Sequence, residues 1–216
     1  ATTRARTSAA TTELDSLHRH ARCPAATATA SGQRIGLLPG SRRPELEQNL
    51  LLLLQLMELL PSTPACDVDL ALVSSLDDDS LRRLSERCGW HLKNGVLERE
   101  GAWGINVRRG AFRAVLQHSD LVIGMAGTAI EQAVGLAKPV LQVPGQGPQF
   151  TVAFAEAQRR LLGPTVFCAS GETGSRGALK ATAELAIALL DRVRKDPGLQ
   201  QQCQAQEEHM FILKEL

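Results

Sequence analysis

The chain has 216 residues, of which 44% are hydrophobic and 22% are charged, a balance typical of a globular protein with a substantial core. Its 24 basic and 23 acidic side chains give a formal net charge of +1, which argues against a dedicated nucleic-acid-binding protein. Aromatic residues make up only 3% of the chain, so base-stacking surfaces are not expected to dominate its function.

Composition divides the chain near residue 32. Residues 1–32 are rich in Ala, Thr, Arg and Ser and carry too little apolar surface to offset the entropy of ordering. We expect this stretch to form a flexible tail or linker with a short helix over residues 13–21. Residues 33–216 are expected to form one folded domain.

From residue 33 onward, short apolar runs alternate with helical patterns. The predicted strands cover residues 35–38, 67–73, 91–97, 103–107, 121–123, 139–143 and 165–167. The predicted helices cover residues 44–57, 77–88, 110–118, 128–137, 150–162, 177–195 and 198–214. This alternation predicts an α/β fold: a doubly wound parallel sheet with helices on both faces and two closing helices.

Cysteine and histidine usage argues against a disulfide scaffold or a structural metal. The five cysteines are an odd number and include no C-x-x-C pair. The five histidines form no i, i+4 pair and no H-E-x-x-H motif. We therefore expect reduced thiols in a cytosolic protein that needs no metal and no cofactor. No signal peptide is expected, and the apolar run at 50–60 is shorter than the roughly 20 residues that span a bilayer.

Ligands of parallel α/β sheets bind at the carboxyl ends of the strands, which draws attention to three glycine-containing loops. The first follows Leu38 and carries Gly40, Ser41 and Arg42 at a predicted helix start. Backbone N–H groups and a guanidinium at such a place suit an anion, especially a phosphate. A capped turn whose arginines face solvent is an equally weighted alternative.

The second loop follows Ile123. Its Gly127 would let a ligand approach the backbone, and Thr128 supplies a hydroxyl at the predicted helix start. Glu131 lies one helical turn further on, where a carboxylate can accept hydrogen bonds from two adjacent ribose hydroxyls. The alternative is a capping box, because residues 128–131 also read T-x-x-E. From the residues alone, the capping box is the favoured interpretation.

The third loop follows Val143 and carries two amides, Gln146 and Gln149, which can donate to and accept from sugar hydroxyls. An ordinary Gly/Pro connection is the commoner alternative. The loop does not complete a G-x-G-x-x-G motif, and the chain has no G-K-[ST] phosphate loop and no G-x-S-x-G elbow. These absences disfavour nicotinamide dehydrogenases, P-loop NTPases and serine hydrolases.

The order of the three loops resembles the nucleotide-sugar-binding half of GT-B glycosyltransferases. Residues 35–47 are similar to the L-L-P-G-S-R-x-x-E segment of lipid-A-disaccharide synthases, and residues 119–131 to their S-D-x-x-x-x-x-S-G-T-A-x-x-E segment. Residues 138–140 are similar to their K-x-P-x-V region, and the glutamine-bearing loop also resembles that of related peptidoglycan glycosyltransferases. The resemblance covers residues 33–165.

This resemblance implies a nucleotide-sugar-binding Rossmann-like domain at 33–216 that takes a UDP-linked amino sugar. In it Glu131 would hold the ribose, Gly127 and Thr128 the diphosphate, and Gln146 and Gln149 the sugar. Gly40, Ser41 and the catalytic Arg42 would neutralise charge on the departing nucleotide, with no metal required. The family further implies hexosyl transfer to a lipid-linked or other acceptor, no nucleic-acid partner, and a cytoplasmic location peripheral to the inner membrane.

Three departures from the synthases qualify this expectation. Ala126 stands where the synthases have Ser, and residues 168–176 lack their Asn-containing segment. The chain also starts at Ala1 and has room for one Rossmann-like domain of the two in a GT-B enzyme, so we expect nucleotide binding with little turnover. Two alternatives stay open: a UDP-sugar epimerase of the same superfamily, and a non-catalytic nucleotide-sugar-binding module.

Overall fold

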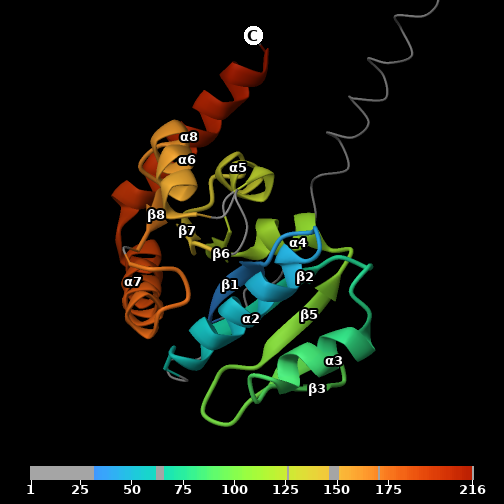
Figure 1. Cartoon of the computed structure of the whole chain (residues 1–216). Helices are drawn as coiled ribbons and strands as arrows, with labels where there is room; N and C mark the ends of the chain where they lie inside the picture. The colour runs from blue at the N-terminus through green and yellow to red at the C-terminus, as the bar shows by residue number, and fades with distance from the viewer. Residues whose placement is uncertain (1–31, 62–65, 126, 146–150, 170, 216) are drawn as a thin grey trace, which may run out of the picture. The chain divides into compact units, whose positions relative to one another are not determined.

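The described part of the chain is built on one eight-stranded sheet. The structure, a computed structural model, describes residues 32–61, 66–125, 127–145, 151–169 and 171–215. In sheet order the strands run β3-β4-β5-β2-β1-β6-β7-β8 (Figure 1). Their bounds are β1 (Gln33–Leu38), β2 (Cys66–Leu72), β3 (His91–Lys93), β4 (Val96–Glu98), β5 (Ile105–Arg109), β6 (Leu121–Gly124), β7 (Val140–Gln142) and β8 (Val166–Cys168).

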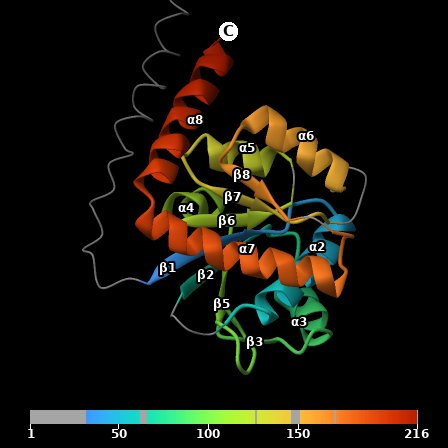
Figure 2. The same ribbon diagram turned by 90° about the vertical axis from the view of Figure 1, so that its left-hand side faces the viewer.

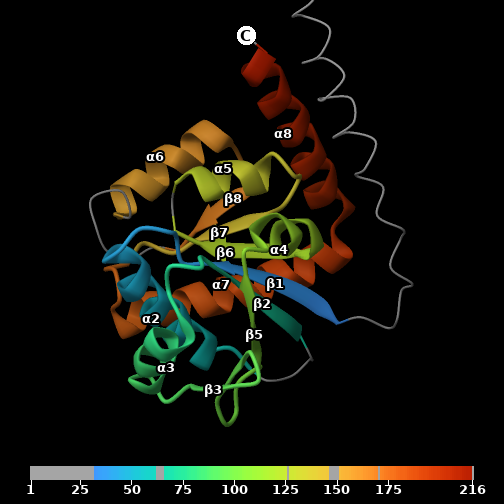
Figure 3. The same ribbon diagram turned by 90° about the vertical axis from the view of Figure 1, so that its right-hand side faces the viewer.

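Helices cover both faces of this sheet. They are α2 (Glu45–Glu58), α3 (Asp78–Glu86), α4 (Phe112–His118), α5 (Thr128–Val134), α6 (Val152–Leu162), α7 (Arg176–Lys195) and α8 (Pro197–Glu215). One core joins α2, α3 and α7 to the sheet, and Figure 2 shows α7 crossing that face. A smaller core joins α4, α5 and α6 to the other face (Figure 3). The predicted α/β fold with a doubly wound sheet is confirmed.

The direction of chain progression reverses between β1 and β6. From β1 the chain moves outward to β2 and β5, all parallel, and α4 then returns it to β6 on the other side of β1. β7 and β8 extend the parallel sheet from β6. Because α2 follows β1 on one face and α5 follows β6 on the other, the loops leaving these strands open a crevice at the carboxyl edge.

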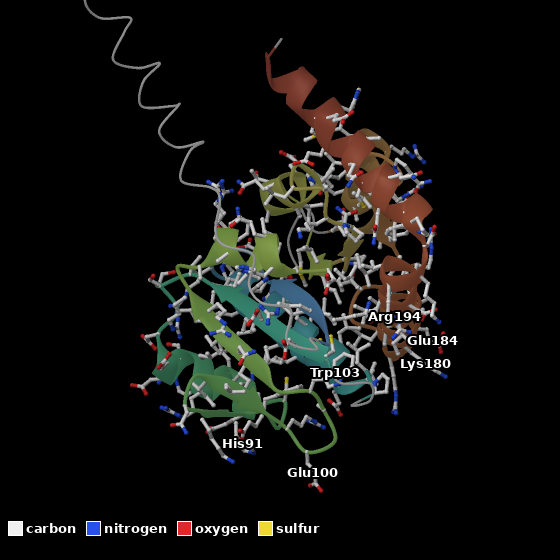
Figure 4. The ribbon with its side chains drawn as sticks, turned by 180° about the vertical axis from the view of Figure 1, so that it is seen from behind. His91, Glu100, Trp103, Lys180, Glu184 and Arg194 are labelled. Atoms are coloured by element: carbon white, nitrogen blue, oxygen red, sulfur yellow. The ribbon has the colours of Figure 1, made fainter. Side chains whose placement is uncertain are left out.

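The longest apolar stripe of the sequence forms the buried face of α2. Leu46, Leu50, Leu53 and Met57 recur at helical spacing and are all fully buried. The outer face of α7 is polar by contrast. Lys180 and Glu184 form an ion pair there and point away from the sheet in Figure 4. Helix patterning therefore sets which surface of each helix meets the core.

The strand predicted over residues 91–97 is wrong, because this segment is a hairpin. β3 and β4 are antiparallel, with His91 opposite Glu98, and the turn between them is Asn94–Gly95. Both turn residues have positive φ, 50° and 77°, as a tight Asn-Gly hairpin turn requires. The hairpin forms one edge of the sheet, where His91 points outward in Figure 4.

The helix predicted over 128–137 is shorter than expected. α5 ends at Val134 with Gly135 as its C-cap, and Ala137 has a positive φ of 53° that no α-helix can contain. The predictions for residues 1–31, including the helix over 13–21, lie outside the described residues. Among the helices that the structure describes, none is long and apolar enough to cross a membrane.

We expect truncation of the α2 stripe to destabilise the domain strongly. Leu53 is 0% exposed, so Leu53→Ala should lower the free energy of unfolding by about 2–5 kcal/mol in urea titrations. Leu161→Ala, at a leucine of α6 that is 71% exposed, is the matched control and should change it by no more than about 0.5 kcal/mol. Equal effects of the two changes would contradict the core described here.

Candidate functional site

A cavity of about 470 Å³ opens at the carboxyl edge of β1 and β6. These two strands pair in parallel with Leu38 opposite Gly124, so the loops that follow them start side by side. The loop after β1 and the start of α2 form one wall, and the start of α5 forms the other. The lining residues are Leu38, Pro39, Gly40, Ser41, Arg42, Glu45, Leu46, Met125, Gly127, Thr128, Ala129, Glu131 and Phe154.

Most of the site residues predicted from the sequence line this one cavity. They are Gly40, Ser41, Arg42, Gly127, Thr128 and Glu131. The structure therefore brings the first and second loops together, although about 85 residues separate them along the chain. Gln146 and Gln149 lie outside the described residues, as does Ala126.

Two neighbouring arginines of the first loop have different surroundings. Arg43 is held away from the cavity by an ion pair with Glu47 (3.2 Å) and a hydrogen bond to the Ser75 carbonyl oxygen (3.2 Å). Arg42 lines the cavity, is exposed, and has no ion-pair partner among the described residues. Arg42 is thus the guanidinium available to an anion in this cavity, which also contains the carboxylates of Glu45 and Glu131.

The backbone of the first loop leaves room for a ligand. Gly40 has a φ of 98°, and a Cβ added there would meet nothing within 4 Å. The Arg42 carbonyl oxygen accepts the Leu46 N–H (2.8 Å), which ties the loop to the first turn of α2. Asn49 on the buried face of α2 donates its side-chain amide to the Pro39 carbonyl oxygen (3.3 Å). The turn is therefore fixed from the helix side and open on the cavity side.

Asn49 also constrains the segment after β7. A Cβ on Gly145 would overlap Asn49 Oδ1 and lie 3.0 Å from Met125 Cγ. Glycine at position 145 thus lets this segment pack against the amide that holds the loop after β1. Sequence reasoning missed Asn49, although a signal was present, because a polar residue within the apolar stripe of α2 indicates a buried hydrogen-bonding role.

The capping-box interpretation of Thr128 and Glu131 is wrong. Thr128 is the first helical residue of α5, and the N-cap is Gly127, which makes no side-chain cap bond. Elsewhere in the described chain, Asp77, Thr151 and Ser175 cap α3, α6 and α7 with side-chain oxygens. Gly127 replaces such a cap with a backbone conformation (φ 138°, ψ −171°) that is nearly exclusive to glycine. Thr128 lines the cavity, and its hydroxyl does not cap the helix.

Glu131 lines the cavity, and a side chain of the neighbouring helix α6 binds its carboxylate. The side chain is half-buried, and its Oε1 accepts a hydrogen bond from Gln158 Nε2 of α6 (3.3 Å). A carboxylate has about four acceptor positions, so this bond leaves capacity for ligand hydroxyls. Gln158 was also missed from the sequence, although it falls on the buried stripe of α6 with Ala155 and Leu162.

A second cavity of about 490 Å³ adjoins the first at the ends of β2 and β5. It shares Gly40, Ser41, Thr128 and Ala129 with the first cavity. Its remaining lining residues are Ala71, Leu72, Val73, Ser74, Gly110, Phe112 and Gln132. The two cavities together thus offer a charged part beside Arg42 and a mostly apolar part beside Phe112.

Neither cavity contains a cysteine. Burial raises the pKa of the Cys66 thiol to about 12 and that of Cys203 to about 11, so both are protonated at neutral pH. In the described part of the chain, no group of three or more His, Cys, Asp or Glu side chains is arranged to hold a metal ion. The lining residues of the two cavities offer a guanidinium, hydroxyls, carboxylates and backbone amides.

Comparison with known proteins identifies the fold. No protein-family model and no curated protein matches the sequence. Among solved structures, the spinosyn rhamnosyltransferase SpnG complexed with thymidine diphosphate matches 86% of this chain with a TM-score of 0.54 at 18% identity. The glycosyltransferase of kitacinnamycin matches 91% (TM-score 0.48, 17% identity), and a putative UDP-N-acetylglucosamine 2-epimerase from Listeria monocytogenes matches 80% (TM-score 0.44, 16% identity).

The chain thus has the Rossmann-like α/β fold found in GT-B glycosyltransferases. It spans 43% of the length of SpnG, 46% of the kitacinnamycin enzyme and 39% of the epimerase. The structural match to SpnG shows the fold, whereas an identity of 18% leaves the reaction to be argued from the site itself.

Because of the backbone conformation of Gly127, we expect alanine to lower stability at position 127 but not at position 177. Gly127→Ala should lower the free energy of unfolding by about 1–3 kcal/mol through backbone strain, since no atom lies within 4 Å of the added Cβ. Gly177→Ala, in α7, also meets no atom but has ordinary helical geometry, and should raise stability by about 0.5–1 kcal/mol. Urea unfolding of both variants measures this difference, and similar values for the two would contradict the strained N-cap.

Proposed function

We propose that the chain is the donor-binding domain of a GT-B glycosyltransferase and holds a nucleoside-diphosphate sugar. The observation that carries this proposal is the convergence of Arg42, Thr128 and Glu131 on one cavity where the strand order reverses. A volume of about 470 Å³ falls within the range of roughly 300–1,000 Å³ common for small-molecule sites.

Each residue has a role that its chemistry supports. Arg42 neutralises the diphosphate with a planar two-pronged donor, helped by the hydroxyls of Ser41 and Thr128. Gly40 and Gly127 supply turns without side chains, so that the diphosphate can approach the backbone. Glu131 accepts hydrogen bonds from the two ribose hydroxyls. The proposal that Gln146 and Gln149 form hydrogen bonds with the sugar hydroxyls rests on the sequence alone.

The second cavity is the place proposed for the nucleobase. It joins the first at Gly40 and Thr128, and its walls include the aliphatic and aromatic side chains of Leu72, Val73 and Phe112. A flat heterocycle can bury its faces against such side chains while its polar edge meets backbone groups at strand ends. The diphosphate would then lie near Arg42 and the sugar on its far side.

In the proposed reaction, an acceptor hydroxyl attacks the anomeric carbon of the sugar, and the bond from that carbon to the β-phosphate oxygen breaks. Negative charge grows on the departing diphosphate, where Arg42 stabilises it more strongly than in the intact donor. The resemblance to GT-B enzymes, in which catalysis takes place in the cleft between two domains, assigns the group that takes the acceptor proton to a second domain. Transfer activity is therefore proposed for the two-domain protein.

The sugar and acceptor are proposed from the resemblance to lipid-A-disaccharide synthases. A UDP-linked amino sugar and a lipid-linked acceptor would follow, with membrane contact through the second domain. SpnG is described as complexed with thymidine diphosphate, which supports a nucleoside diphosphate as the class of ligand. An epimerase would instead alter the UDP-sugar without any acceptor, and a non-catalytic module would bind UDP without turnover in any context.

Arg42→Ala is expected to weaken UDP binding by about tenfold or more, because a charge-assisted contact with the diphosphate is lost. Arg43→Ala is the matched control, since Arg43 pairs with Glu47 outside the cavity. Isothermal titration calorimetry with UDP measures both changes. An unchanged affinity of the Arg42 variant would remove Arg42 from the site.

Glu131→Ala is expected to abolish a preference for ribonucleotides. The unaltered chain should bind UDP about tenfold or more tightly than 2′-deoxy-UDP, because Glu131 accepts from both ribose hydroxyls. The variant should bind the two nucleotides with similar affinity. If calorimetry finds that the preference survives in the variant, the ribose is not held by Glu131.

A further inference from the structure

Four hydrogen bonds converge on the side-chain amide of Gln158 in α6, which is only 6% exposed. Its Oε1 accepts from the Gly127 backbone N–H (2.9 Å) and from Gln142 Nε2 (2.8 Å). Its Nε2 donates to the Gly127 carbonyl oxygen (3.0 Å) and to Glu131 Oε1 (3.3 Å). One side chain thus connects α6 with β7 and with the start of α5.

These bonds use the full capacity of the amide, which has two donor hydrogens and an oxygen with two lone pairs. Turning the amide over would place its NH2 group against the Gly127 N–H and its oxygen against the Glu131 carboxylate. Both contacts would be repulsive, so the observed orientation is the favoured one. Gln142, itself fully buried on β7, supports this orientation from the sheet.

Gln158 binds the two cavity-lining residues Gly127 and Glu131, which follow β6. It forms hydrogen bonds with both the N–H and the carbonyl oxygen of Gly127, whose backbone conformation is nearly exclusive to glycine. It also directs a donor to Glu131, which fixes one oxygen of that carboxylate. Because Gln158 engages the Gly127 N–H, this group is not offered to a ligand, and the role of Gly127 in the cavity is its shape.

We propose that Gln158 is a positioning residue of the donor site: it holds the Glu131 carboxylate in the orientation that receives the ribose, and it fixes the Gly127 turn beside the diphosphate. This inference rests on the proposed function. Gln158 does not line the cavity, so it acts through Glu131 and Gly127 and needs no contact with the ligand. Losing Gln158 should therefore reduce the preference for UDP over 2′-deoxy-UDP, in addition to any loss of affinity that the two nucleotides share.

Gln158→Glu and Gln158→Met test the proposal by calorimetry with UDP and 2′-deoxy-UDP. Both variants keep the length of the side chain and remove the two N–H donors. We expect the preference for UDP to fall about tenfold in each. In Gln158→Glu the preference should recover partly as pH falls from 8 to 5, because a protonated carboxyl regains one donor. The Met variant should show no such pH dependence.

Gln117→Glu is the matched control for the change in charge, since Gln117 is exposed on α4. It should keep the preference of the unaltered chain. Circular dichroism and urea unfolding show whether each variant is folded, and the Met variant carries the test if the Glu variant is not. A folded variant of Gln158 with an unchanged preference for UDP would overturn the proposal.

Failure of the proposed function gives a different result from failure of this inference. If the unaltered chain binds neither nucleotide, the donor-site proposal fails and the role of Gln158 fails with it. If the unaltered chain prefers UDP, and Glu131→Ala loses the preference while both Gln158 variants keep it, only the role of Gln158 is wrong.

Discussion

The parallel pairing of β1 with β6 is the constraint on which the candidate site depends. It sets Leu38 opposite Gly124, so that the loop after β1 and the loop after β6 leave the same edge of the sheet. Because α2 and α5 then turn to opposite faces, their first residues become the two walls of one cavity. A slip of this register would move Arg42 relative to Thr128 and Glu131 and divide the site.

Two buried side-chain amides fix the positions of the loops that this strand pairing brings together. Asn49 ties the loop after β1 to α2 and packs against Gly145, while Gln158 ties the start of α5 to α6 and β7. A buried amide is costly unless its hydrogen bonds are made, so each one holds its partners in a narrow set of positions. Asn49 and Gln158 do not line the cavity, but they fix the positions of the groups that would contact a ligand.

The fold and the cavity-lining loops could be predicted from the sequence, because hydrophobic periodicity and glycine-rich strand ends are local signals. The hairpin at β3 and β4 was missed although a local signal was present, because Asn94–Gly95 is the dipeptide typical of a two-residue hairpin turn. The T-x-x-E pattern favoured Thr128 as the N-cap of α5. The N-cap is Gly127 instead, in a backbone conformation that the sequence pattern does not indicate. Asn49 and Gln158 stand out in the sequence only as polar residues on buried helix stripes, because tertiary packing sets the partners of their hydrogen bonds.

A crystal structure of this chain with UDP tests the central claim most directly. The account predicts electron density for the diphosphate beside Arg42 and for the ribose hydroxyls within hydrogen-bonding distance of the Glu131 carboxylate. The Gln158 amide should keep its bond to Glu131 in that complex. Nucleotide bound at another place on the domain, with the cavity between α2 and α5 left to solvent, would contradict the account.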